Sequence, residues 1–83
     1  MHTDRWNVQI DLDEDEDNTH AHAILNGRPG VTVSTHGRAR RRPGDAVVPE
    51  IGEELAVARA LYAVADRLMD DASYDVANLT HHV

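Results

Sequence analysis

Four arginines crowd one short stretch of an acidic chain. Arg38, Arg40, Arg41 and Arg42 fall within the sequence RARRRPGD, although the 83 residues have a formal net charge of −7. Each guanidinium can neutralise a phosphate, and its fork of donors suits contacts to RNA backbone and 2′-hydroxyl groups. The surplus of acids elsewhere produces a field that repels a polyanion. Two interpretations stay open: these arginines contact RNA, or they pair with Asp and Glu of the same or a partner subunit.

Histidines offer a second kind of chemistry. His20 and His22 share one side of an expected strand, and His36 belongs to the next strand. If the strands align, three imidazoles converge and can bind one transition metal. Nothing in the sequence fixes that alignment, so surface histidines that gain charge as the pH falls are the favoured interpretation and metal binding the alternative.

The acidic stretch DLDEDEDNTHAH superficially resembles a calcium-binding loop, because Asp11, Asp13 and Asp15 occupy its first, third and fifth positions. The sixth position requires glycine for a sharp turn and holds Glu16, while the twelfth requires a bidentate glutamate and holds His22. The stretch therefore predicts a solvated acidic hairpin turn, with weak divalent-cation binding as the alternative.

Catalytic patterns are sparse in this sequence. Ser34 and Ser73 stand alone, and neither a glycine-rich phosphate loop nor a GxSxG elbow occurs. The carboxylates Glu53 and Glu54 are explained by their expected place in the first turn of a helix. We expect a protein that is not an enzyme and needs no cofactor.

Alternation of apolar and polar residues predicts three strands. Trp6 to Leu12 alternates, the acidic turn follows, and Thr19 to Leu25 alternates again. The turn signals of NGRPG precede a third strand that runs from Val31 to about Arg40. Short connections between such strands predict an antiparallel meander.

After Pro49 the period changes to that of a helix. Pro49 suits the first helical position, and acids follow it near the positive end of the helix dipole. The stretch ASYD is expected to break this helix, so that 75–80 forms a short second one. Apolar residues recur every three or four positions and predict the face that packs on the sheet: Ile51, Leu55, Ala58, Leu61, Tyr62, Ala65, Leu68, Met69 and Ala72.

The expected fold class is therefore α+β, with a three-stranded antiparallel meander followed by one long helix, in a single domain over 1–83 whose ends, 1–5 and 81–83, are flexible. Its core is rich in alanine, and without cysteine no disulfide can reinforce it. A homodimer is expected for this reason. No stretch has the apolar length of a signal peptide or membrane span, so we expect a cytoplasmic protein.

Three stretches resemble a small actinobacterial family of uncharacterised proteins with a double-stranded-RNA-binding-domain-like (dsRBD-like) fold. They are VPEIGEELAVARAL, the upstream WNVQIDLDED and the later YDVANLTHH, so the resemblance spans Trp6 to His81. It implies a β-β-β-α core, often dimeric, and for one member a shape similar to ribosome hibernation factors expressed in dormancy. The residues that carry the motif at the helix start are Pro49, Glu50, Ile51, Gly52, Glu54, Leu55, Ala58, Arg59, Ala60 and Leu61.

Hibernation factors bind the ribosome through helices rich in Lys and Arg, whereas this helix carries more acidic than basic residues. Because the helix differs from theirs in this way, the residues expected to contact RNA are Arg38, Arg40, Arg41 and Arg42. The resemblance thus predicts a non-enzymatic accessory protein linked to stress or dormancy and associated with the ribosome or structured RNA. The alternative is an acidic homodimeric interaction module that binds a basic protein and no nucleic acid.

Overall fold

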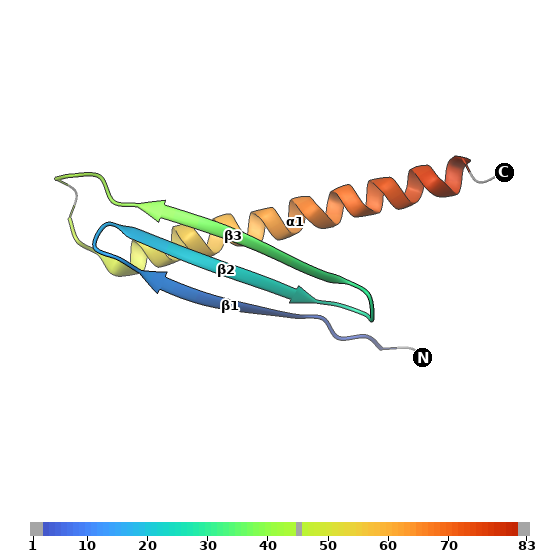
Figure 1. The fold of residues 1–83 in the computed structure, drawn as a ribbon, viewed down its shortest axis with the longest axis horizontal. Coiled ribbons are helices and arrows are strands. Elements are labelled where there is room, and N and C mark those ends of the chain that lie inside the picture. The colour runs from blue at the N-terminus through green and yellow to red at the C-terminus, as the bar shows by residue number, and fades with distance from the viewer. Residues whose placement is uncertain (1–2, 45, 82–83) are drawn as a thin grey trace.

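Three strands and one helix make up the chain in a computed structural model that describes residues 3–44 and 46–81, without the side chains of 80 and 81. The strands are β1 (Asn7–Glu14), β2 (Asn18–Asn26) and β3 (Thr32–Arg40), and the helix is α1 (Pro49–His81). Figure 1 shows the strands side by side and the helix crossing one face of the sheet. The expected α+β order, a meander followed by one long helix, is confirmed.

The sheet is antiparallel in the order β1-β2-β3, with short turns between its strands. Ile10 lies opposite Ala23, and Ala23 lies opposite Thr35. Because side chains alternate between the two faces of a strand, this register directs the apolar residues of all three strands to one face. The acidic turn is shorter than expected, since β1 continues to Glu14 and β2 begins at Asn18.

Small residues bring α1 close to β2 and β3. Ala56 and Ala60 are fully buried, and Gly37 of β3 lies against the helix backbone between them. The Thr35 hydroxyl donates a hydrogen bond of 2.7 Å to the Ala60 carbonyl. The buried core of the described residues is Ala21, Ala23, Leu25, Val33, Ala39, Ala56, Ala60 and Val64.

The helix face expected to pack on the sheet is wrong in part. Leu68 packs against the core, but Ile51, Tyr62 and Met69 are 55%, 72% and 67% exposed. The face that contacts the sheet consists chiefly of alanines and valines beside Leu68, because only small side chains permit the close approach to Gly37. The larger apolar residues of α1 therefore lie on the side away from the sheet.

The expected break at ASYD is also wrong, because α1 runs without interruption through 33 residues. At 1.5 Å per residue it is about 50 Å long, whereas a strand of nine residues spans about 30 Å. Figure 1 shows the C-terminal part of the helix, in red, projecting past the sheet. His81 is the last residue of α1. Of the ends expected to be flexible, residues 1, 2, 82 and 83 lie outside the described residues.

No helical segment in the ranges 3–44 and 46–81 could serve as a membrane span.

Candidate functional site

The open face of the sheet, opposite α1, brings the three central histidines together. His22 lies opposite His36 in the register, and His20 lies two positions further along β2, opposite Arg38. The His36 ring stacks between the other two, with centroids 4.5 Å from His22 and 4.9 Å from His20. Registry between β2 and β3, which the sequence left undetermined, thus places all three imidazoles in one row.

Hydrogen bonds connect this histidine stack to its neighbours. His20 Nε2 and His36 Nδ1 are 2.8 Å apart, so one nitrogen donates and the other accepts. His22 Nε2 is bonded to the Ser34 hydroxyl at 2.6 Å. Partial desolvation in the stack lowers the pKa of His36, and the charges of His22, His20 and Arg38 lower it further. The neutral ring is therefore the favoured form of His36.

The metal alternative for His20, His22 and His36 requires ring nitrogens that point at a common centre. The rings are instead nearly parallel, with interplanar angles of 12° between His20 and His36 and 8° between His22 and His36. Nitrogen lone pairs of parallel rings lie in parallel planes and so do not meet at one point. Within 3–44 and 46–81 no three His, Cys, Asp or Glu side chains are arranged to hold a metal ion. The acidic stretch does not form a calcium-binding loop, since Asp11 and Asp13 belong to β1.

Arg38, Arg40 and Arg41 are divided between two surfaces, and Arg42 lies in the connection between β3 and α1. Arg38 and Arg40 alternate with the buried Ala39, so they lie on the open face with the histidine stack. Arg41 turns toward the β1–β2 hairpin and pairs with Asp17 at 2.6 Å. This is the local ion pair that the sequence offered as one interpretation. Arg59 of α1 donates a hydrogen bond of 2.6 Å to the Arg38 carbonyl.

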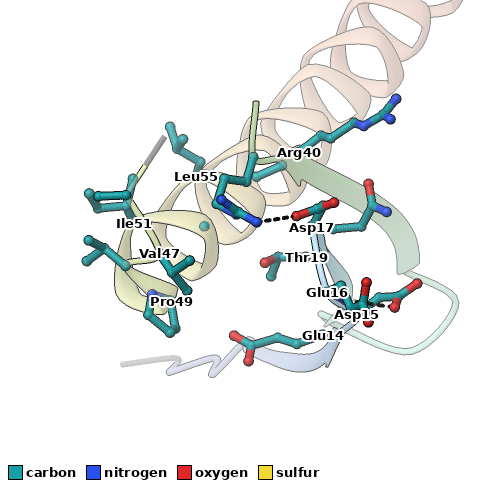
Figure 2. A pocket seen from close by; sticks show the side chains of 16 residues that line it. Glu14, Asp15, Glu16, Asp17, Thr19, Arg40, Val47, Pro49, Ile51 and Leu55 are labelled. Atoms are coloured by element: carbon teal, nitrogen blue, oxygen red, sulfur yellow. Dashed lines mark hydrogen bonds and ion pairs between the residues drawn. The ribbon is translucent and has the colours of Figure 1, made fainter. Parts of the chain in front are cut away.

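A pocket of about 410 Å³ lies at the end of the molecule where the β1–β2 turn meets the start of α1. Figure 2 shows Val47, Pro49, Ile51 and Leu55 on one side of it and the acidic turn on the other. Ile51 and Leu55 are 55% and 44% exposed. The sequence did not suggest this pocket, because its two walls are 30 or more residues apart in the chain.

A carboxyl pair joins Glu14 of β1 to Glu53 near the start of α1, next to this pocket. A hydrogen bond between the Glu53 and Glu14 side chains raises the pKa of Glu53, and the negative charge of Glu14 raises it further. A proton held between two carboxyls stabilises this contact, whereas two ionised carboxylates repel.

The side of α1 away from the sheet carries a regular apolar stripe. Its members are spaced alternately four and three residues apart, which is the heptad pattern of helices that pack against other helices. Most of its larger side chains are between 40% and 80% exposed. We call this set the outer stripe: Ile51, Leu55, Ala58, Tyr62, Ala65, Met69, Ala72, Val76 and Leu79.

The sequence and fold are similar to those of known mycobacterial proteins. The family model described as Rv2632c-like matches residues 4–83. The chain belongs to the Rv2632c-like family. It is 43% identical to the uncharacterized protein Mb1767 of Mycobacterium bovis over 76 residues, which are 92% of this chain and 80% of that protein. The same figures hold for MT1780 of Mycobacterium tuberculosis.

A crystal structure of a family member matches this fold. The structure of Rv2632c superposes with a TM-score of 0.78 at 37% identity, and the match covers 98% of this chain and 93% of that one. The protein Rv2632c of M. tuberculosis is 47% identical over 45 residues, or 54% of this chain and 48% of that protein. The family resemblance noted from the sequence is thereby confirmed, and the β-β-β-α architecture is common to both structures.

Proposed function

We propose that this member of the Rv2632c-like family is a non-enzymatic, cytoplasmic interaction module that works as a homodimer. The observation that carries the proposal is the outer stripe, a heptad pattern that runs the length of α1 on the side that no other element of the described chain covers. A second helix bearing the same stripe is the natural cover for it, because heptad residues pack into the gaps of an identical surface.

The energetics favour this pairing. Burying the exposed part of each larger side chain in the stripe contributes about 1 kcal/mol or more. Six such residues in each of two copies offset an association cost of about 4–15 kcal/mol. The intrachain core is thin, since five of its eight buried residues are alanine. Dimerisation supplies the apolar burial that the isolated chain lacks.

The acidic surface left outside the dimer suits a basic partner. The chain has a net charge of −7, and the β1–β2 turn concentrates four acids in 14–17. Charge complementarity of this kind accelerates association and selects the partner. This is the interaction-module alternative that the sequence offered, in which no nucleic acid takes part.

Thermal melting at a series of protein concentrations tests the proposal. A homodimer has an unfolding midpoint that rises with concentration, because mass action favours the associated state. Urea-induced unfolding should depend on concentration in the same way. A midpoint that stays constant over a hundredfold range of concentration would contradict the proposal.

A second candidate function is contact with the ribosome or structured RNA, as expected for a protein active in stress or dormancy. Arg38 and Arg40 support it, because both lie on the open face of the sheet beside the histidine stack. Co-sedimentation with ribosomes at two salt concentrations tests it, since phosphate contacts weaken steeply with added salt. The double change Arg38→Ala and Arg40→Ala should abolish binding, whereas Arg28→Ala at the far turn should not. Salt-independent or absent co-sedimentation would contradict RNA contact.

A further inference from the structure

Two features of the molecule bear on the direction in which the two helices pair. One is the apolar wall of the pocket, formed by residues on both sides of the helix start. The other is the projecting end of α1, where Val76 and Leu79 are 62% and 77% exposed. Both belong to or adjoin the outer stripe, and they lie at its opposite ends.

We infer that the pocket is the receptor for the projecting helix end of a second copy, so that the two helices pair antiparallel. The inference rests on the proposed homodimer and names its geometry. In this arrangement Val76 and Leu79 of each chain enter the pocket of the other, beside Val48, Ile51 and Leu55. The interface is isologous, since the same two surfaces meet twice around a two-fold axis.

Side-chain size along the outer stripe selects the antiparallel direction. Large residues, Leu55, Tyr62, Met69 and Val76, occupy every second position, and alanines occupy the three positions between them. A parallel pair in register places like residues together, so layers with two tyrosines alternate with layers of two alanines that leave gaps. Close packing favours layers of equal volume.

An antiparallel pair places a large residue opposite a small one at each layer. Tyr62 then faces Ala65 of the second copy, Met69 faces Ala58, and Leu55 faces Ala72. The same register brings Val76 opposite Ile51 and Leu79 opposite Val48. The layers that fix the register at the centre of the stripe therefore also direct the helix ends into the pockets.

The pocket has the chemistry of a receptor for an apolar helix end. Its inner wall combines Val47, Val48, Pro49, Ile51 and Leu55, and its volume of about 410 Å³ holds several aliphatic side chains. The acids of the β1–β2 turn lie on the opposite side (Figure 2), and they are exposed. A parallel dimer would pack the two projecting ends against each other and leave both pockets unfilled.

Cysteine cross-linking tests the register, because the chain contains no cysteine of its own. Ile51→Cys and Val76→Cys are prepared as separate proteins, mixed under exchange conditions, and oxidised. A disulfide requires Cβ atoms within about 4.5 Å, and the two positions are about 37 Å apart along one helix. The expected result is a covalent dimer of twice the chain mass in the mixture and none from either protein alone.

Tyr74→Cys serves as the matched control for Val76→Cys. It lies at the same helix end with a similar exposure of 66%, but on the side away from the outer stripe. Mixed with Ile51→Cys it should give no covalent dimer. The mass of the species in solution is measured by light scattering before oxidation, so that association is established independently of cross-linking.

Each outcome separates the inference from the proposed function. Cross-linking of either single protein with itself would show a parallel pair and overturn the inference while the homodimer stands. A dimeric mass without cross-linking in the mixture would overturn the inference as well. A monomeric mass would overturn the proposed function, and the inference with it.

Discussion

Gly37 of β3 and Ala60 of α1 meet backbone to backbone, with no room for a side chain between them. A Cβ atom on Gly37 would overlap the Ala56 carbonyl oxygen and the Ala60 nitrogen. The hydrogen bond from Thr35 to the Ala60 carbonyl lies beside this contact. Together they fix the depth at which the helix lies on the sheet, and so they decide which face of α1 is left outward.

Gly37→Ala should therefore lower the free energy of unfolding by about 1–3 kcal/mol or more, because the helix backbone must move to admit a methyl group. Urea denaturation measures this. Gly52→Ala is the control, since its new methyl group meets chiefly the Thr19 side chain, which can rotate, and alanine favours a helix by about 1 kcal/mol. Equal losses in the two variants would contradict the close approach.

Met69→Glu should weaken the homodimer at least about tenfold, because a charge replaces a large apolar side chain in the outer stripe. Folding of the single chain should change little, since Met69 is 67% exposed there. Tyr74→Glu introduces the same charge off the stripe and should leave association intact. Size-exclusion chromatography with light scattering compares the two. Equal weakening by both variants would indicate a general charge effect instead.

The histidine stack should make stability depend on pH. The pKa of His36 is lowered in the folded protein, so the unfolded chain takes up the proton first. The contribution of His36 to the free energy of unfolding is complete above pH 6.5. It declines as the pH falls toward the lowered pKa of the folded protein. His36→Asn should flatten this decline in the melting temperature. An unchanged slope between neutral and mildly acidic pH in the variant would contradict the assignment.

The carboxyl pair predicts the opposite sign. The hydrogen bond to Glu14 raises the pKa of Glu53 above its ordinary value of 4.5. Its contribution to stability is complete below pH 4.5 and is lost as the pH rises through the raised value. Glu53→Gln keeps a hydrogen-bond donor without the charge, so it should raise the melting temperature at pH 7 and have little effect near pH 4. Glu54→Gln, with no such partner bond among the described contacts, is the control. A rise of similar size in both would contradict the pair.

The strands were predictable because their alternation is a local property. The sequence from Trp6 to Leu12 shows the period of two, and the structure places β1 there with a small extension. The start of α1 was predictable for the same reason, since Pro49 and the following acids are signals of the chain itself. The contact of the three histidines was not, because it depends on the register between β2 and β3.

The orientation of α1 was mispredicted because hydrophobicity alone favours the larger side chains. The sheet accepts the face with Ala56, Ala60 and Val64, since Gly37 permits an approach that leucine and tyrosine would block. The apolar pattern thus predicted the helix correctly, but most of the residues it selected are not on the face that packs on the sheet. The expected helix break at ASYD was also wrong. The apolar spacing of the outer stripe continues through that stretch to Val76 and Leu79, and the helix continues with it.

Sedimentation equilibrium of the unmodified protein decides whether the homodimer exists, because it gives the mass of the species in solution without reference to shape. A species of twice the 9.2 kDa chain is expected at micromolar concentration. That species should dissociate in the Met69→Glu variant. A single species of 9.2 kDa in the unmodified protein, folded and stable at the same concentration, would contradict it.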